Sequence, residues 1–341
     1  METKLFTAPL SDAEYDAAAR IIRTGGLLGI PTETVYGLGA DALNEDACRH
    51  IYEAKGRPQD NPLIIHIPDE SWLPRYCREI PAAAYALARR FWPGPLTMIL
   101  PKQDIVPLRT TGGLSTVGVR CPDHPVTLEI IRRAGVPIAA PSGNTSGRPS
   151  PTCARHMMED MQGKIDGIVD GGPCGVGVES TIVDLTCQPP RLLRPGGLPL
   201  EALREVLGEI EVDRAVVAEP KQGEKPKAPG MAYRHYAPRA PVTVVAGDPE
   251  KSAAYIQARL SGQSGIICFH EFLDRFHGHI VHDLGSLTDP AEQARRVFDA
   301  LRTFDGTDVG EIWAQCPDSR GLGLAVGNRL KKAAGFHVIE V

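Results

Sequence analysis

The stretch LLGIPTETVYGLGAD (residues 27–41) sets the pattern of the fold. Its first part, LLGIPT (27–32), predicts a buried strand, and the strand runs into a turn that contains Gly37 and Gly39. Small hydroxyl residues at the carboxyl end of a strand lie where open α/β sheets hold ligands. The spacing matches neither the dinucleotide-binding fingerprint nor a Walker loop. A purely structural turn, in which Gly37 and Gly39 are required only by the backbone, explains the segment as well as a ligand site does.

On both sides of this stretch, strands and helices alternate over the first 200 residues. Buried strands are predicted at 62–67, 96–101, 116–122 and 137–142, and further short strands in GIVDGG, ESTIVDLT and RLLRPGG. Helical spacing is found at 11–24, 44–57, 81–92, 126–135 and 199–208. Helices that interleave with strands, followed by several strands in a run, favour an α/β or α+β domain with a mixed sheet.

The second half of the chain predicts a linker and a smaller domain. Residues 209–240 are rich in Pro, Lys and Gly and read as a linker, although YRHYAP (233–238) is unusually aromatic and basic for a spacer. From residue 241 onward short strands alternate with helices at 249–261, 289–305 and 323–335. This regular alternation favours a small parallel-sheet domain. We therefore predict domains at 1–208 and 241–341, joined by the linker.

Composition indicates an ordinary globular protein. The chain of 341 residues is 42% hydrophobic and carries a net charge of −5, so strong nucleic-acid binding is not expected. The N-terminus lacks an apolar signal core and no stretch approaches a membrane span, so we expect a cytoplasmic protein without membrane contact. The eight cysteines are scattered singly, which favours reduced thiols.

Cations at the ends of predicted elements suggest an anion site. Two of them close the helix at 44–57, and the others lie in or beside strands: Lys55, Arg57, Arg120 and Arg194. A buried guanidinium needs an anion, which for Arg120 is either a structural carboxylate or a ligand carboxylate. The loop after residue 139 is rich in hydroxyl and amide groups that suit phosphate: Ser142, Asn144, Thr145, Ser146 and Ser150. The sequence thus predicts a cationic, hydroxyl-lined cleft for a nucleotide and a carboxylate, without covalent catalysis.

These segments together resemble the L-threonylcarbamoyladenylate synthase family, in its two-domain form with a YrdC-type domain first. The resemblance is carried by PTETVYGLGAD, AKGRPQDNPLIIHI, WPGPLT, PIAAPSGNTSGRPSPT, GVESTIVDLT, RLLRPGG, APGMAYRHYAP and RGLGLAVGNRLKKA. It implies a YrdC-type twisted mixed sheet with a basic cleft, followed by a smaller Rossmann-like parallel α/β domain.

The resemblance also implies a reaction, in which L-threonine, bicarbonate and ATP give threonylcarbamoyl-AMP and pyrophosphate. A separate complex then transfers the threonylcarbamoyl group to the adenosine beside the anticodon of certain tRNAs. By position, the family's K-x-R and S-x-N pairs fall on Lys55, Arg57, Ser142 and Asn144. The expected threonine-binding residues are Thr32, His66, Arg120, Ala140 and Ser180. The expected ATP-binding residues are Lys55, Asn61, Thr116, Ser142, Ser150, Arg194 and Tyr236.

Mg²⁺ is expected to accompany ATP, although no carboxylate cluster in the sequence marks a metal site. Tyr236 suggests that the linker closes over the nucleotide as a lid.

Three other interpretations were weighed. A basic cleft could bind RNA without chemistry, but the net charge and the lack of Lys/Arg runs argue against it. Carbamoyl-adenylate chemistry with another acceptor, as in hydrogenase maturation, would be accompanied by zinc-finger cysteine pairs, which this sequence lacks. Finally, His277 and His279 could share a strand face and bind a metal, with His270 and His282 nearby, but surface histidines explain the pattern better.

Overall fold

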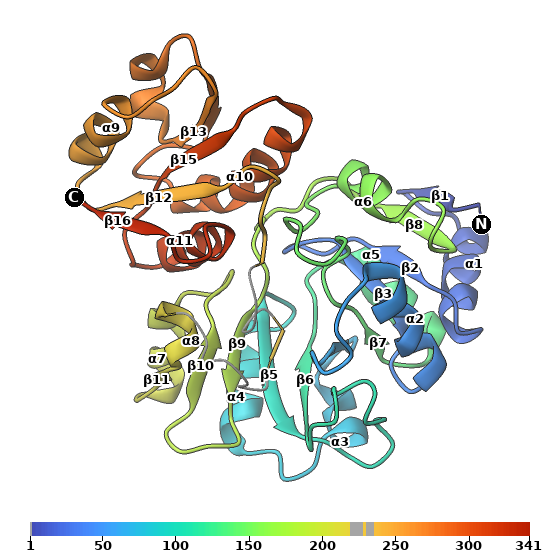
Figure 1. The fold of residues 1–341 in the computed structure, drawn as a ribbon. Helices are drawn as coiled ribbons and strands as arrows, with labels where there is room; N and C mark the ends of the chain where they lie inside the picture. The colour runs from blue at the N-terminus through green and yellow to red at the C-terminus, as the bar shows by residue number, and fades with distance from the viewer. Residues whose placement is uncertain (1, 219–227, 230–234) are drawn as a thin grey trace.

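The computed structural model describes residues 2–218, 228–229 and 235–341, which form a large sheet and a small sheet, each covered by helices (Figure 1). The large sheet has eleven strands in the order β1-β8-β2-β3-β7-β4-β6-β5-β9-β10-β11. The small sheet has five strands in the order β14-β13-β15-β12-β16. None of the helices within the described residues combines the length and the apolar character that crossing a membrane requires.

The large sheet and its helices use the first 217 residues. Its strands are β1 (Lys4–Thr7), β2 (Leu28–Ile30), β3 (Gly37–Asp41), β4 (Ile64–His66), β5 (Leu96–Pro101), β6 (Thr116–Arg120), β7 (Ile138–Ala139), β8 (Gly167–Asp170), β9 (Thr181–Asp184), β10 (Arg191–Arg194) and β11 (Glu211–Val212). Its helices are α1 (Asp12–Arg23), α2 (Glu45–Lys55), α3 (Leu73–Tyr76), α4 (Ala82–Phe91), α5 (Pro125–Ala134), α6 (Ala154–Met161), α7 (Leu200–Leu207) and α8 (Arg214–Val217), with a 3₁₀ turn at Glu70–Trp72. Parallel and antiparallel pairs both occur, so the predicted mixed sheet is confirmed.

Local signals fix several of these elements. A capping box begins α1: the Ser11 side chain accepts from the backbone of Glu14, and the Glu14 carboxylate accepts from the backbone of Ser11. The sheet has a core on each face, because successive strand residues point to opposite sides. On β8, Ile168 packs with α2 and α6, whereas the next residue, Val169, packs with α1 and α5.

The small sheet is entirely parallel, as predicted for the C-terminal domain. Its strands are β12 (Val242–Ala246), β13 (Ser264–Cys268), β14 (Ile280–Asp283), β15 (Glu311–Gln315) and β16 (Val338–Glu340). Its helices are α9 (Pro249–Gln257), α10 (Pro290–Thr303) and α11 (Leu322–Ala333), with 3₁₀ turns at His270–Phe276 and Phe304–Gly306. His277 and His279 precede β14, so they do not share a strand face as the metal hypothesis requires. Among the described residues, no group of three or more potential metal ligands is found.

The predicted start of the linker at residue 209 is too early. Residues 211 and 212 form β11, which pairs in parallel with β10, and α8 follows with Asp213 as its cap. These residues escaped prediction because β11 is two exposed residues long and shows no periodicity. We therefore propose that the first domain extends to about residue 218. Residues 219–227 and 230–234 of the predicted linker lie outside the described residues.

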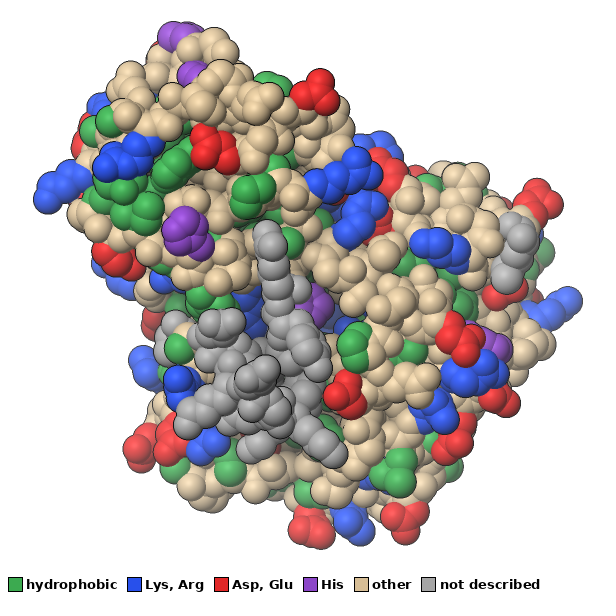
Figure 2. Space-filling model, viewed as in Figure 1, with side chains coloured by type: hydrophobic (Ala, Val, Ile, Leu, Met, Phe, Trp, Pro, Cys, Tyr) green, Lys and Arg blue, Asp and Glu red, His purple; other side chains and the backbone are tan. Residues whose placement is uncertain are grey.

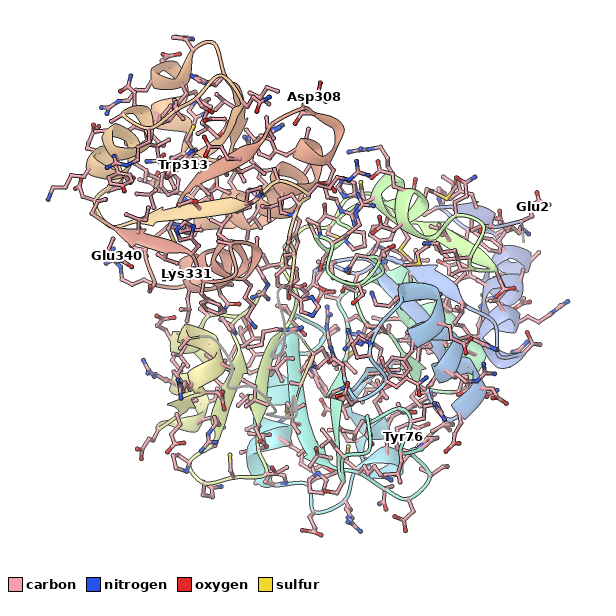
Figure 3. The ribbon with its side chains drawn as sticks, viewed as in Figure 1. Glu2, Tyr76, Asp308, Trp313, Lys331 and Glu340 are labelled. Carbon is pink, nitrogen blue, oxygen red and sulfur yellow. The ribbon has the colours of Figure 1, made fainter. Side chains whose placement is uncertain are left out.

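Charged contacts join the two sheets and their helices. Arg302 on α10 pairs with Asp160 on α6 at 2.8 Å, and Arg148 pairs with Asp305 at 3.2 Å. Figure 3 shows α11, on which Lys331 is labelled, on the side of the small sheet that faces the first domain. From this helix, Asn328 donates to the carbonyl of Val216 at 2.8 Å. Acidic and basic side chains are interspersed over the described part of the face shown in Figure 2.

Candidate active site

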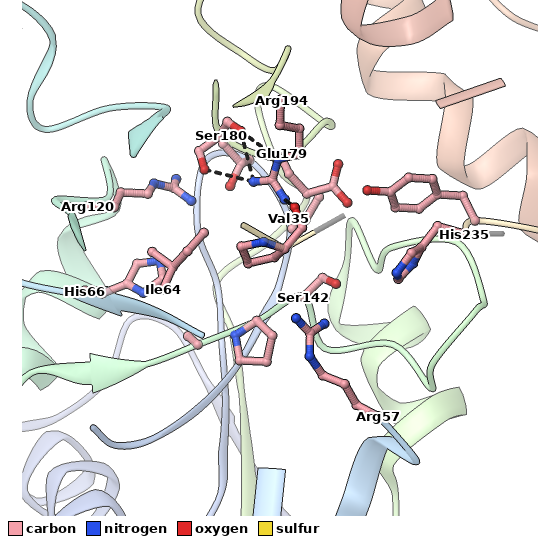
Figure 4. A pocket seen from close by; sticks show the side chains of 15 residues that line it. Val35, Arg57, Ile64, His66, Arg120, Ser142, Glu179, Ser180, Arg194 and His235 are labelled. Atoms are coloured by element: carbon pink, nitrogen blue, oxygen red, sulfur yellow. Dashed lines mark hydrogen bonds between the residues drawn. The ribbon is translucent and has the colours of Figure 1, made fainter. Parts of the chain in front are cut away.

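A small cavity of about 40 Å³ lies over the middle of the large sheet (Figure 4). Strands β4 and β6 contribute one wall and the loop after β7 another. The third wall is formed by the segments at 179–180 and 194, together with residues 235–236 from the far side of the predicted linker. The predicted site residues that line it are Arg57, His66, Arg120, Ala140, Ser142, Ser180, Arg194 and Tyr236. Residues far apart in sequence therefore meet in one place, as predicted.

Two guanidinium groups in this cavity lack a carboxylate partner among the described residues. Arg57 is 8% exposed and donates only to the backbone carbonyls of Asn61 and Pro62. Arg194 is 6% exposed and donates to Ser180 and to the carbonyl of Pro229. Burial lowers the pKa of each to about 10, so both remain charged at neutral pH. The nearby charge of Glu179 partly offsets the effect of burial on the pKa of Arg194, but neither guanidinium forms an ion pair within the described residues. Buried cations of this kind favour an anionic ligand.

Arg120, in contrast, has a structural partner. Its Nη2 lies 2.6 Å from a carboxylate oxygen of Glu33, and its Nε donates to the carbonyl of Gly94. Glu33 stands between Thr32 and Thr34 in the turn that follows β2. Of the two alternatives for this guanidinium, the structure provides the structural carboxylate. Arg120 still lines the cavity and can share its charge with a ligand.

Lys55 lies behind the cavity rather than on its wall. Its Nζ donates to the carbonyl of Ser142 at 2.5 Å and also to that of Asn144. Burial, and then the neighbouring charge of Arg57, hold the pKa of Lys55 well below its usual value. The lysine at the end of α2 thus fixes the loop that carries Ser142. This contact could not be inferred from the sequence, because 87 residues separate the two partners.

Glu179 is a cavity residue that the sequence did not single out. It is 5% exposed, accepts from Ser150 at 2.6 Å and pairs with Arg329 of α11 at 2.7 Å. Burial alone would raise its pKa, but Arg329 and Arg194 outweigh burial and lower the pKa to about 2. The C-terminal domain therefore holds an ionised carboxylate in the wall of the cavity.

The aromatic and imidazole groups of the cavity are neutral. Burial, and then Arg120, lower the pKa of His66 to about 3, while its Nδ1 lies 3.3 Å from the carbonyl of Ile138. Burial, and then Arg57, lower the pKa of His235 to about 3. Tyr236 is 3% exposed, and its ring packs on that of Phe298 at 5.1 Å between centroids. Its positive φ of 65° is uncommon for a residue other than glycine. Two residues of the predicted linker are thus built into the site.

The remaining predicted residues lie around the cavity without lining it: Thr32, Asn61, Thr116, Asn144 and Ser150. Thr32 donates to the carbonyl of Val35, and Asn144 accepts from the hydroxyl of Ser142 at 2.6 Å. Thr116 is on the face of β6 that carries Arg120, because side chains four residues apart on a strand point the same way. The Oδ1 atom of Asn61 is buried without a hydrogen-bond partner in the described part of the chain.

The fold and the cavity define an α/β protein with a small cavity, lined by three arginines, over the middle of its large sheet. Residues 20–196 match the Sua5–YciO–YrdC family model, which carries the description telomere recombination. Residues 198–335 match the model of the threonylcarbamoyl-AMP synthase C-terminal domain. The chain belongs to this family, in its two-domain form.

Relatives and solved structures agree with this assignment. Threonylcarbamoyl-AMP synthase of Pyrococcus abyssi is 50% identical, with 95% of each chain covered. The Bacillus subtilis protein of the same name is 47% identical over 97% of this chain and 95% of its own. The structure of P. abyssi Sua5 complexed with L-threonine is 47% identical over the full length of both chains, with a TM-score of 0.91. A double alanine variant of P. abyssi Sua5, at a histidine and the tyrosine that follows it, gives a TM-score of 0.94 over 99% of this chain and 98% of its own.

Proposed function

We propose that this protein is a threonylcarbamoyl-AMP synthase, which converts L-threonine, bicarbonate and ATP to threonylcarbamoyl-AMP and pyrophosphate. The observation that carries the proposal is its full-length similarity to P. abyssi Sua5, whose structure contains L-threonine. The two buried guanidinium groups without carboxylate partners support it, because all three substrates bring negative charge. The product would pass to a tRNA threonylcarbamoyl-transfer complex, and we place the reaction in the cytoplasm.

Threonine would bind at the β4–β6 side of the cavity. Arg120 would receive its carboxylate, since that guanidinium has donors besides the one that Glu33 occupies. His66 is neutral, so it can accept from or donate to threonine without adding charge. The hydroxyl of Ser180 and the backbone of Ala140 line the same cavity, and Thr32 shapes the turn beneath it.

ATP would bind along the wall that carries Arg57 and Arg194, because these two lining guanidinium groups form no ion pair with a carboxylate in the described part of the chain. Ser142 lies on the loop that Lys55 fixes, so hydroxyl and backbone donors of that loop can face the phosphates. The unpartnered Oδ1 of Asn61 supports a place in the nucleotide site. We assign the other nucleotide contacts to Thr116, Asn144, Ser150 and Tyr236.

The chemistry needs no protein nucleophile. The amine of threonine adds to CO₂ derived from bicarbonate and loses a proton, which gives a carbamate. A carbamate oxygen then attacks the α-phosphorus of ATP, the bond to the bridging oxygen breaks, and pyrophosphate leaves with that electron pair. Arg57 and Arg194 would stabilise the charge that builds on the phosphates, and the enclosed cavity would exclude water from the labile adenylate.

Mg²⁺ on the phosphates is expected from ATP chemistry, but the described residues offer no dedicated site for it. They hold no group of three metal ligands, and the cavity carboxylate Glu179 is already engaged by Arg329 and Ser150. Mg²⁺ would therefore arrive with ATP, held by phosphate oxygens and water. We derive no step from it.

The segment with Tyr236 is proposed to act as a lid. A cavity of about 40 Å³ is far below the ~300–1,000 Å³ of pockets that enclose larger ligands. Tyr236 and His235 fill part of the site, so they have to move before ATP enters. A chain truncated after residue 218 tests this, because loss of the lid shortens the lifetime of the adenylate. It carries Glu179→Gln because Arg329 is removed with the C-terminal domain, and the full-length Glu179→Gln variant is the control. Unchanged pyrophosphate release together with an unchanged adenylate lifetime would refute the lid.

The direct test of the function is pyrophosphate release with each of the twenty amino acids, with and without bicarbonate. We expect release only with threonine and bicarbonate together. Pyrophosphate release in the absence of threonine or of bicarbonate would contradict the proposal. RNA binding with a steep salt dependence and no ATP turnover would favour the RNA-binding alternative instead.

A further inference from the structure

A second cavity, which we call the crevice, lies in the C-terminal domain at the carboxyl edge of the small sheet. It has a volume of about 200 Å³, well above the ~15 Å³ that a single water requires. It is lined by residues that directly follow β12, β13 and β15 and by the first turns of α9, α10 and α11. None of the residues so far assigned to the reaction lines it.

The topology of the small sheet explains why a crevice forms there. The connection from β12 through α9 to β13 and the connection from β15 through α11 to β16 run in opposite directions along the sheet. Right-handed crossovers therefore place α9 and α11 on opposite faces. β12 and β15 are neighbours in the sheet. After β12 the chain continues to one face of the sheet, and after β15 it continues to the other. Ligands of open α/β sheets bind at such a switch point.

A buried polar atom in the crevice lacks a partner. Gln293 on α10 is 1% exposed and lines the crevice, and its Oε1 has no hydrogen-bond partner in the described part of the chain. The amide orientation is determined, because the Nε2 donates to the carbonyl of Ser286 at 2.6 Å. The free atom is thus an acceptor, and burying it unpaired costs on the order of 1–3 kcal/mol. A ligand with an N–H or O–H donor would satisfy it.

The crevice is also preformed. Below it, Gln315 is fully buried and accepts from the backbone N–H of Phe269 at 3.1 Å. The same amide donates to the carbonyl of Pro249 at 2.9 Å and to the hydroxyl of Ser252. One side chain therefore braces two walls of the crevice. On the third side, α11 begins at Leu322 after Gly321, which supplies no side-chain cap, and the N–H of Gly323 donates to the carbonyl of Arg320 at 2.9 Å.

The lining indicates the class of ligand. The rings of Phe269, Pro249, Pro290 and Pro317 offer flat apolar walls, and no Lys, Arg or His lines the crevice. Its charged lining residue is Asp318, whose carboxylate pairs with Arg320 at 2.8 Å and keeps lone pairs that can accept from hydroxyl groups. Burial raises the pKa of the Cys316 thiol to about 11, so the crevice contains no nucleophilic thiolate.

We propose that the crevice binds an uncharged nucleoside or free nucleobase. A ring N–H or amino group would donate to Oε1 of Gln293. The apolar walls would stack on the heterocycle, and Asp318 would accept from a ribose hydroxyl where a sugar is present. This site is separate from the cavity over the large sheet.

The test is isothermal titration of the full-length protein with the four common ribonucleosides and their free bases. The first cavity is kept occupied by threonine and a non-hydrolysable ATP analogue, so that it cannot bind the probe. We expect at least one probe to bind with one equivalent per chain. Gln293→Leu, which removes the acceptor, and Leu287→Trp, which fills the crevice, should each weaken binding at least tenfold.

The matched control is Gln257→Leu, which removes an exposed glutamine that also donates to a backbone carbonyl. It should leave binding unchanged. Circular dichroism checks that the variants are folded, and Leu287→Trp still tests the site if Gln293→Leu does not fold. Absence of binding, or binding that neither variant weakens, overturns the proposal. Tighter binding of a nucleoside monophosphate, or binding of free amino acids alone, overturns the ligand class.

Discussion

Replacing Arg329 by methionine removes the buried cation that the C-terminal domain supplies to Glu179. The two groups are 2.7 Å apart, with side chains that are 0% and 7% exposed. A pKa of Glu179 lowered from 4.5 to about 2 corresponds to about 3 kcal/mol in favour of its ionised form. Breaking one partner of a buried pair costs ~3–5 kcal/mol in other proteins. We therefore expect Arg329→Met to lower the free energy of unfolding by about 3 kcal/mol.

The assay is urea unfolding of a double-mutant cycle that contains Arg329→Met, Glu179→Gln and both together. Because Arg329→Met leaves an unpaired carboxylate, the double variant should be more stable than the sum of the single effects predicts, by more than 1 kcal/mol. The control is Arg90→Met, which breaks a pair of similar length, 2.8 Å to Glu205, with both side chains more than half exposed. It should change stability by less than about 1 kcal/mol. Effects that add within about 0.5 kcal/mol would refute the coupling.

Three further predictions concern the cavity. Lys55→Ala should lower kcat/KM for pyrophosphate formation at least ~10²-fold, because the loop that Lys55 holds carries the phosphate donors. Lys102→Ala is the control, since it removes a comparable hydrogen bond from a lysine to a backbone carbonyl, and it should have no effect. A loss under threefold in Lys55→Ala would contradict the role of Lys55. The pKa values of His66 and His235 are about 3, so the unfolded chain binds more protons below pH 6.5, and stability should fall as the pH decreases from 6.5 toward 3. His66→Leu should reduce this slope by up to ~1.4 kcal/mol per pH unit, measured from urea midpoints between pH 6 and 4, and an unchanged slope would count against a neutral buried His66. Tyr236→Ala should shorten the lifetime of the adenylate, followed by its hydrolysis to AMP, while an equal lifetime would argue that the residue only packs against Phe298.

The regular elements and the cationic character of the site could be predicted because their signals are local. Ser11 and Glu14 stand three residues apart, which suffices to place the start of α1. Arg57, Arg120 and Arg194 each lie at the end of a predictable element, and the sheet brings them to one cavity. The threonine and nucleotide roles, in contrast, came from the family resemblance.

What could not be predicted depends on contacts between distant residues. Glu179 reads as an ordinary polar residue before a strand, and its partner Arg329 is 150 positions away on a helix of the other domain. The same holds for Glu33, which lies 87 positions from Arg120. The crevice of the C-terminal domain depends on the order of the strands in the small sheet. The alternation of strands and helices along the sequence does not determine that order.

The ion pairs between the two domains restrict how this chain can be recombined with its relatives. Among the described residues, three of the arginine–carboxylate pairs that cross the boundary have a largely buried carboxylate: Arg302 with Asp160, Arg148 with Asp305 and Arg329 with Glu179. A chimera that exchanges the C-terminal domain has to bring complementary residues at all three places, or it buries an unmatched charge. Only domains with complementary charges at these positions are therefore expected to combine into a stable chain. A shortened form without the C-terminal domain would need Glu179 replaced by a neutral residue.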